Sequence, residues 1–260
     1  MDSSAICFDR HDEIAIVSLN RPDKLNAISR AMLRELSEIF RSAGADKSLR
    51  AIILTGAGNK AFSAGTDLSE LINVPAEDAR EVADAGQQLC DYVESCAVPV
   101  IAAVNGIAAG AGCELALASH FRIATPSATF SLPEIKLGII PGYGGTQRLA
   151  REVGHGRALE IMLTARTVNS DEALRIGLVN RIAPADGLLE EALRLGHEIS
   201  QLAPLAIRAC LQAVTKGTEL PLSEGLALEA ELFASLFATS DMREGTRAFL
   251  EKRPPVFKGE

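Results

Sequence analysis

One stretch of the sequence determines the fold class: PVIAAVNGIAAGAGCELALAS, residues 99–119. Its apolar run at 100–104 is short and bounded by a proline and a glycine, which predicts a buried strand. A glycine-rich turn follows, and the small apolar residues after it predict a helix from about 111 to 119. Strand, turn and helix in this order are typical of an α/β architecture.

The same alternation continues on both sides of this stretch. β-branched or apolar runs predict strands at 14–19, 51–55, 121–124 and 129–131. Helical spacing predicts helices at 30–42, with Ser29 as the cap, and at 77–96. From about residue 185 onward the chain is rich in Ala and Leu, and no further strand is predicted.

The composition indicates an acidic globular protein. The chain has 260 residues, of which 47% are hydrophobic and 23% charged, and its formal net charge is −8. A chain of this length buries about 70–75% of its unfolded surface, enough for one large domain. Net negative charge disfavours nucleic acid as a partner, although a local basic patch would still hold one anionic ligand.

Neither the cysteines nor the histidines are spaced as metal ligands, and we expect no metal site. Free thiols in a reducing compartment fit the scattered cysteines better than disulfides do. The first residues lack the pattern of a presequence, and the apolar stretch at 98–117 is too broken by Pro, Asn, Glu and Gly for a membrane span. We therefore expect a cytoplasmic protein with no membrane partner. The cysteines are Cys7, Cys90, Cys96, Cys113 and Cys210.

The glycine-rich turn at 106–112 opens a helix, and unpaired N–H groups at a helix start favour anions. The dinucleotide fingerprint requires a third glycine, which is missing after Gly110 and Gly112. No Lys-Ser or Lys-Thr pair follows, so a P-loop is also excluded. A nicotinamide dehydrogenase is thus a weak alternative.

Two glutamates stand out among apolar neighbours. Glu114 lies within CELALA, where burial without a partner is costly. Glu134 follows a proline at a possible helix start, where a carboxylate also stabilises the helix dipole. Taken alone, each is either a solvent-facing residue of a helix start or a site residue. Small residues around Gly65 similarly suit close approach of a ligand or a simple capped turn at Thr66 or Asp67.

Together these segments resemble the crotonase, or enoyl-CoA hydratase/isomerase, family. The resemblance spans nearly the whole chain, and its order and spacing make it specific. It is carried by NRP (20–22) with Asn26-Ala27, AFSAGTDL (61–68), PVIAAVNG (99–106), GCELALAS (112–119), LPEIKLGIIPGYGGTQRL (132–149) and REGTRAFLEKRPPVF (243–257).

The resemblance implies a crotonase-like spiral of ββα units at residues 1–190, holding the active site and the CoA-binding site. It assigns residues 191–260 to a C-terminal helical region that builds a homotrimer, often paired into a hexamer. The implied activity is that of an enoyl-CoA hydratase, a carbon–oxygen lyase acting on an acyl-CoA thioester. No cofactor is implied beyond the coenzyme A of the substrate.

The resemblance also assigns roles to residues. Glu114 and Glu134 correspond to the two catalytic glutamates that hold one water, and the backbone N–H groups of Thr66 and Ala111 to the oxyanion hole. Phe249 and Lys252 correspond to residues that often reach the substrate of a neighbouring subunit. The implied substrate-binding and CoA-binding residues are Lys24, Ala64, Gly65, Asp67, Gly110, Gly142, Phe249 and Lys252.

Three positions depart from the family pattern. Ala111 carries a Cβ where many members have glycine, which requires a negative φ. His120 stands where many relatives have Asp, with no role evident from the sequence. Tyr143 stands where relatives often have a small residue, and it either shortens the acyl pocket or meets a polar acyl tail.

Other functions remain open at this stage. Members of the same fold isomerise enoyl-CoA double bonds or hydrolyse acyl-CoA. A non-catalytic binding or scaffold protein, including an RNA-binding one, is the alternative from another class. The pair of glutamates favours hydration, and the net charge of −8 disfavours RNA.

Overall fold

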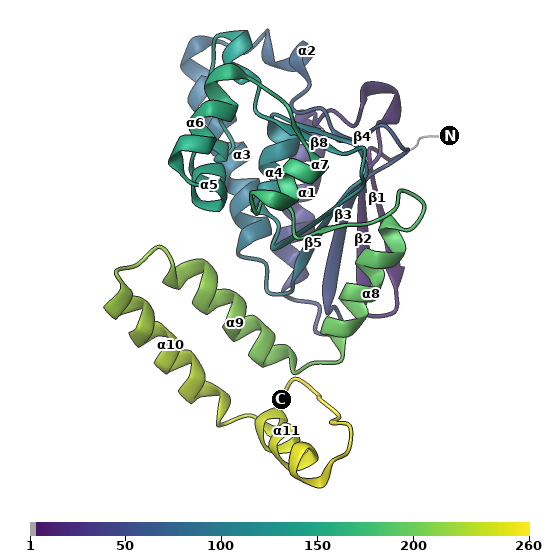
Figure 1. The fold of residues 1–260 in the computed structure, drawn as a ribbon, viewed down its shortest axis with the longest axis vertical. Helices are drawn as coiled ribbons and strands as arrows, with labels where there is room; N and C mark the ends of the chain where they lie inside the picture. Colours follow the sequence, from purple (N-terminus) through teal and green to yellow (C-terminus); the bar gives the residue numbers. More distant parts are fainter. Residues whose placement is uncertain (1–3) are drawn as a thin grey trace.

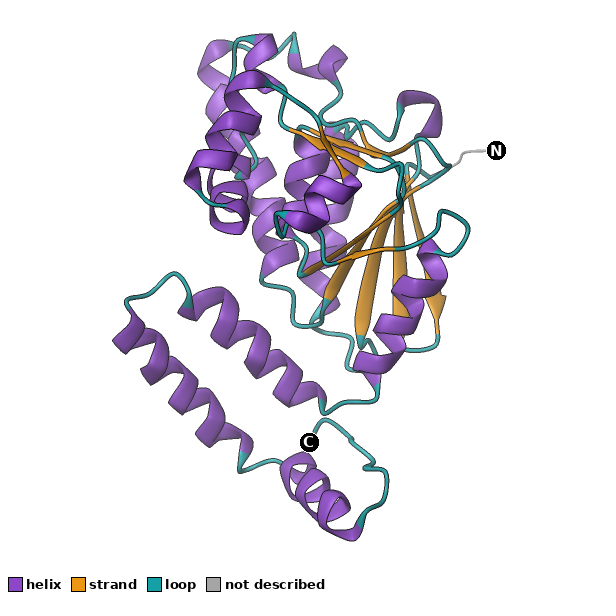
Figure 2. Cartoon of the chain, viewed as in Figure 1, coloured by secondary structure: helices purple, strands orange, loops and turns teal. Residues whose placement is uncertain are grey.

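The computed structural model describes residues 4–260 and contains two β-sheets surrounded by helices (Figures 1 and 2). The larger sheet has the order β1 (Ile6–His11), β2 (Ile14–Leu19), β3 (Ala51–Gly56), β5 (Val100–Val104), β7 (Phe121–Ala124) and β10 (Arg181–Ile182). The smaller sheet has the order β4 (Ala61–Ser63), β6 (Ile107–Ala109), β8 (Thr129–Ser131) and β9 (Val168–Asn169). All pairs are parallel except β1 with β2 and β8 with β9.

Helices connect and cover these strands. The α-helices are α1 (Arg30–Ala43), α2 (Leu68–Leu71), α3 (Ala79–Glu94), α4 (Ala111–Ala118), α5 (Gly145–Val153), α6 (His155–Thr164), α7 (Ser170–Arg175), α8 (Leu188–Ser200), α9 (Pro204–Gly217), α10 (Leu222–Leu236) and α11 (Ser240–Glu251). Three short 3₁₀ helices are η1 (Pro22–Lys24), η2 (Ala76–Asp78) and η3 (Glu134–Leu137).

The central strands β2, β3 and β5 are buried on both faces, as expected of parallel strands covered by helices. Alternate residues therefore enter two separate cores. On one face, residues such as Ile53 and Ile101 pack with Leu188 and Ala192 of α8. On the other face, the larger core lies under α1, α3 and α4 and extends to the smaller sheet.

The last three helices extend away from this core, and α9 and α10 lie side by side (Figure 1). No residue of α9 or α10 is buried, and α11 buries only Asp241 and Ala248. The domain boundary expected between residues 190 and 191 falls inside α8, which packs on the larger sheet. The part of the chain that leaves the core begins at α9.

All five strands predicted from the sequence are confirmed, and four of them (14–19, 100–104, 121–124, 129–131) match to the residue. Ser29 caps α1 by accepting a hydrogen bond from the Met32 N–H at 3.3 Å. The turn predicted at 106–110 is partly wrong, because β6 lies within it and pairs with β4 and β8. Within residues 4–260, no helix has the length and apolar character to span a bilayer, and no cluster of three potential metal ligands occurs.

Candidate active site

A cavity of about 1360 Å³ lies where α3, the start of α4 and the loop at 138–144 meet. Its walls combine apolar side chains with polar and charged side chains from several elements. Eight of the residues expected to form the site line this cavity: Ala64, Gly65, Thr66, Gly110, Ala111, Glu114, Glu134 and Gly142. Other lining side chains include Leu71, Val82, Ala83, Gln87, Leu137, Ile140, Tyr143 and Arg148.

Glu114 is the only charged residue of α4, a helix in which every residue is buried. Its side chain is held by the backbone, because Oε1 accepts hydrogen bonds from the N–H groups of Tyr143 at 2.8 Å and Gly145 at 2.7 Å. Burial, together with the charge of Glu134, raises the pKa of Glu114 to about 7, although the two N–H donors oppose the shift. A carboxyl with this pKa exchanges a proton near neutral pH.

Glu134, the first residue of η3, is also buried and faces the same cavity. Burial raises its pKa. Its Oε1 lies against Gly110, whereas its Oε2 is buried without a hydrogen-bond partner among the described residues. A buried oxygen without a partner is unusual in a native protein and often marks a site that takes a ligand or a water.

Two backbone N–H groups point to an anion site beside these carboxyls. Ala111 is the first residue of α4, so its N–H has no partner within the helix. The N–H of Thr66 likewise donates no hydrogen bond within residues 4–260. The loops meet at Gly65 and Gly110, since a Cβ on Gly65 would lie 3.4 Å from the Ala111 nitrogen.

The backbone conformation makes this approach possible. Gly65 and Gly110 have φ values of +104° and +51°, a region that favours glycine. Ala111 does not belong to the described non-glycine residues with positive φ, so its Cβ causes no backbone strain. Ala111 therefore meets the requirement for a negative φ that its Cβ imposes.

The turn at 22–26 lies beside the loop at 61–67. The Ala64 N–H donates to the Leu25 carbonyl at 2.9 Å, and the Lys24 ammonium lies 3.7 Å from Asp67 Oδ2. Asp67 itself caps α2 through Ser69 and pairs with Arg21 at 2.9 Å, and these contacts lower its pKa to about 2. Lys24 and Asp67 lie outside the cavity lining.

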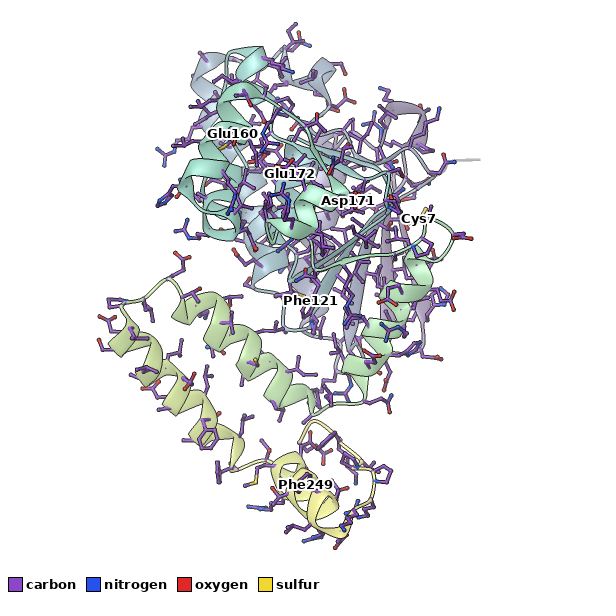
Figure 3. All side chains as sticks on the ribbon, in the orientation of Figure 1. Cys7, Phe121, Glu160, Asp171, Glu172 and Phe249 are labelled. Atoms are coloured by element: carbon purple, nitrogen blue, oxygen red, sulfur yellow. The ribbon has the colours of Figure 1, made fainter. Side chains whose placement is uncertain are left out.

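Phe249 and Lys252 are not brought to the cavity of their own chain. They lie at the end of α11, and Figure 3 shows Phe249 at the far end of the molecule from the core. The Phe249 side chain is 84% exposed. Within one chain the structure therefore leaves this part of the expected binding site separate from the rest.

Several residues that position the site were missed by sequence reasoning. The N–H groups of Tyr143 and Gly145 hold Glu114, yet backbone donors leave no signature in the sequence. Gln87 and Arg148 donate to carbonyls of the same loop from α3 and α5. Neither contact has a signature in the sequence. The acceptor of Gln87 lies 55 residues away, that of Arg148 lies 5 residues away, and both contacts depend on how the loop folds.

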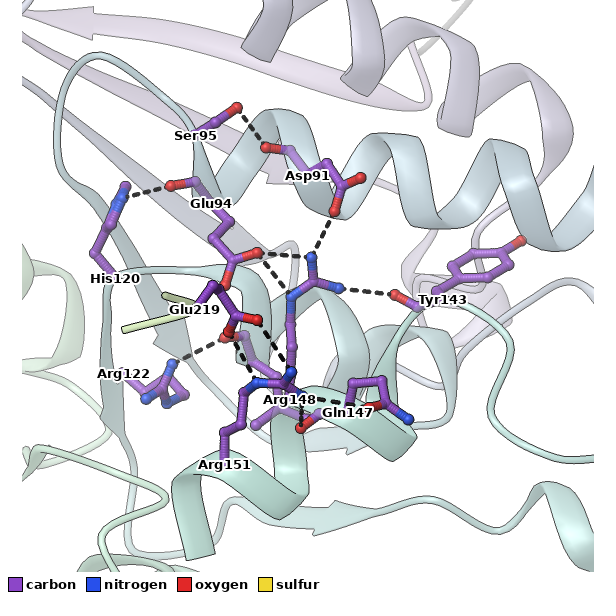
Figure 4. A network of polar contacts seen from close by, with 11 residues as sticks. Asp91, Glu94, Ser95, His120, Arg122, Tyr143, Gln147, Arg148, Arg151 and Glu219 are labelled. Atoms are coloured by element: carbon purple, nitrogen blue, oxygen red, sulfur yellow. Dashed lines mark hydrogen bonds and ion pairs between the residues drawn. The ribbon is translucent and has the colours of Figure 1, made fainter. Parts of the chain in front are cut away.

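The structure shows the surroundings of Tyr143 and His120, whose roles the sequence leaves open. Tyr143 is buried in the cavity wall, and its ring lies directly over Gly86 of α3. His120 lies outside the cavity and links α3 to β5, because its Nδ1 accepts from the Val100 N–H at 2.8 Å. Its Nε2 contacts the Glu94 carbonyl at 3.1 Å (Figure 4). This arrangement requires a neutral imidazole, and burial lowers the pKa of His120 accordingly.

Comparisons with known proteins find similarity over nearly the whole chain. The family model for "Enoyl-CoA hydratase/isomerase" matches residues 9–260. The chain is 41% identical to a "Crotonyl-CoA hydratase" of Syntrophomonas wolfei and 40% identical to a "Short-chain-enoyl-CoA hydratase" of Clostridium acetobutylicum, over 97% of each chain. The crystal structure of an enoyl-CoA hydratase from Bacillus anthracis superposes with a TM-score of 0.95 at 41% identity, covering 99% of this chain and 100% of that one.

Proposed function

Since the chain belongs to the enoyl-CoA hydratase/isomerase family and has the crotonase fold, we propose that it hydrates trans-2-enoyl-CoA thioesters to 3-hydroxyacyl-CoA. The observation that carries the proposal is the pair of buried carboxyls, Glu114 and Glu134, facing one cavity beside two unpaired backbone N–H groups. Relatives named as hydratases at about 41% identity support the same reaction.

The N–H groups of Thr66 and Ala111 would bind the thioester oxygen. Negative charge grows on that oxygen as water adds to Cβ, so fixed donors stabilise the transition state more than the ground state. Loss of one such donor typically costs about 3–4 kcal/mol of activation free energy. Ala111 contributes further because it lies at the start of α4, where the helix dipole is positive.

The two carboxyls would divide the proton transfers. Burial raises the pKa of both carboxyls, so each holds a proton more readily than a free glutamate does. Only Glu114 accepts two N–H donors, which favour its ionised form above about pH 7, whereas no donor reaches Oε2 of Glu134, to which we assign the proton. Glu114 then takes a proton from the water that attacks Cβ, and Glu134 gives its proton to Cα. The product gains the hydroxyl of the water at Cβ and the proton of Glu134 at Cα. The proton left on Glu114 then passes to Glu134, directly or through solvent, and restores the starting state.

The assembly we propose is a homotrimer or a dimer of trimers. Large apolar side chains on α9–α11 are exposed in the single chain, which is rare unless another surface covers them. A neighbouring chain would also bring Phe249 and Lys252 to the CoA site. These exposed side chains are Val214, Leu222, Phe233, Phe237, Phe249 and Leu250.

The five free cysteines support the expected cytoplasmic location.

Crotonyl-CoA hydration tests the proposal, measured as loss of the conjugated-enoyl absorbance. We expect turnover by the wild type and a loss of roughly 10²–10⁴-fold in Glu114→Gln and in Glu134→Gln, because each variant removes one acid–base group. Wild-type activity retained in either variant would contradict the two-carboxyl scheme.

The same assay separates the alternatives. Conversion of a 3-enoyl-CoA without hydration would identify an isomerase, and release of free CoA would identify a hydrolase. Salt-dependent RNA binding without any turnover would identify a non-catalytic relative.

A further inference from the structure

The loop at 142–145 presents its N–H groups to Glu114 because its carbonyls are held on the opposite side. In a planar trans peptide the N–H and C=O bonds point in opposite directions. A contact that fixes a carbonyl therefore also fixes the direction of the N–H in the same peptide group.

Each of three successive carbonyls in this loop has its own donor. Gly142 O accepts from Gln87 Nε2 at 3.1 Å, and Tyr143 O accepts from Arg148 Nη1 at 3.1 Å. Gly144 O accepts from the N–H groups of Gln147 and Arg148 at the start of α5. The Tyr143 N–H, which shares a peptide group with Gly142 O, consequently points to Glu114 at 2.8 Å.

Arg148 is itself fixed by α3. Its Nη2 donates to Asp91 at 2.7 Å and to Glu94 at 2.8 Å, and only 13% of its side chain is exposed (Figure 4). Gly144, at φ +101°, leaves the space that the guanidinium occupies, and a Cβ there would overlap with Nη1. The planar fork of arginine reaches these partners simultaneously, which a lysine does not.

We propose that Gln87 and Arg148 are positioning residues that hold the 142–145 loop against Glu114. Gln87 fixes the peptide group whose N–H, at Tyr143, donates to Glu114, and Arg148 fixes the next peptide group, which connects this donor to the second one at Gly145. The inference rests on the proposed hydration, in which Glu114 is the base. Neither side chain needs to contact the reacting atoms, because each acts through a loop carbonyl. Displacing a catalytic group by about 1 Å costs up to roughly 10²-fold in rate.

Gln87→Met is the most informative substitution. It removes the donor to Gly142 O on the exposed surface of α3 and changes no charge, so folding should be retained. We expect kcat to fall by roughly 2- to 10-fold, the equivalent of one net hydrogen bond, with little change in KM. Gln88→Met is the matched control, since Gln88 makes no side-chain hydrogen bond in the described chain and does not line the cavity.

Arg148→Gln and Arg148→Lys test the other contact. We expect each to lower kcat by roughly 10- to 100-fold, because lysine keeps the charge but not the fork. Arg166→Gln is the control, since Arg166 also pairs with two carboxylates but lies outside the loop contacts. Wild-type kcat in Arg148→Lys would show that charge alone suffices and would overturn the positioning role of Arg148.

The second readout is the titration of Glu114, followed by infrared difference spectroscopy of its carboxyl with Glu114→Gln as the assignment control. Losing an N–H donor destabilises the ionised form, so Gln87→Met should raise the pKa of Glu114 and move the acid limb of the kcat profile to higher pH. Gln88→Met should leave both unchanged. The other titratable or charged groups around Glu114 are Glu134 of η3, Arg148 of α5, Tyr143 of the loop, Cys90 of α3, and Cys113, which precedes Glu114 in α4.

The outcomes separate this inference from the proposed function. A wild type that does not hydrate crotonyl-CoA would refute the function, while the infrared titration would still test the loop contacts. A Gln87→Met enzyme with raised KM and unchanged kcat and Glu114 pKa would show direct substrate contact instead. Unchanged kcat and unchanged pKa in both Gln87→Met and Arg148→Gln would overturn the inference.

Discussion

At the scale of one residue, the buried carboxyl of Glu114 makes the stability of the folded protein depend on pH. Its burial raises its pKa to about 7, so the folded state holds a proton that the unfolded chain has released above about pH 4.5. The stabilisation from this group is complete below the unfolded pKa and is lost as the pH rises through 7. A neutral residue of the same shape has no such dependence.

We therefore expect Glu114→Gln to gain stability relative to the wild type as the pH rises. The raised pKa corresponds to a change of roughly 2–3 kcal/mol in the difference between the two free energies of unfolding from pH 5 to pH 8. Chemical denaturation of both proteins at the two pH values measures it. A difference independent of pH would mean that Glu114 titrates at its ordinary pKa.

Gly86 and Tyr143 form a matched pair. Tyr143 fills the space over Gly86, where a Cβ would overlap with the ring. Gly86→Ala should destabilise the protein by about 1–3 kcal/mol, the usual cost of overpacking a core, although alanine favours the helix itself. Tyr143→Leu should relieve this cost in the double variant. Additive effects in a double-mutant cycle of unfolding free energies would contradict direct packing between them.

At the scale of elements, burial determined which strands could be predicted from the sequence. β2 and β5 were predicted to the residue because strands buried on both faces read as continuous apolar runs. β1 was missed since only Ile6 of its ICFDRH segment is buried and the rest is partly or fully exposed at the sheet edge. β6 was missed because it is only three residues long, lies between two glycines, and gains strand structure only from pairing with β4 and β8.

The same reasoning applies to the candidate site. Glu114 and Glu134 were selected by residue type and by resemblance to a family, and the structure places both at one cavity. The groups that hold Glu114 are backbone N–H groups of a loop 29 and 31 residues away. Every residue carries such a donor, so only the fold determines which of them reach the carboxyl.

His120 connects two elements and supplies the prediction at this scale. It satisfies the first N–H of β5 at Val100 and contacts the last turn of α3 at Glu94. His120→Ala would leave the part-buried Val100 N–H without an acceptor, and we expect a loss of about 1–3 kcal/mol in stability with little change in kcat. Thermal unfolding and crotonyl-CoA turnover check the two parts. A large loss of kcat at unchanged stability would instead connect His120 to the chemistry.

At the scale of the whole molecule, the cavity and the end of α11 are separate in one chain but joined in the proposed assembly. The core supplies the two carboxyls and the N–H groups, whereas the expected CoA contacts of Phe249 and Lys252 lie on a helix that points away from it (Figure 1). Leu250 beside them is 75% exposed. An enzyme built this way depends on its neighbours for substrate binding rather than for the chemical step.

Leu250→Glu should therefore lower the molecular mass measured by light scattering from that of a trimer or hexamer to that of a monomer, because a charge is costly in an apolar contact. The resulting chain should retain a folded core and show a raised KM for crotonyl-CoA. Lys252→Gln is the matched variant, expected to keep the mass of the wild type and raise KM alone, since it removes a charge for phosphate and no apolar surface. A wild-type protein that is already monomeric would disprove the proposed assembly, and an unchanged KM in Lys252→Gln would remove this lysine from the binding site.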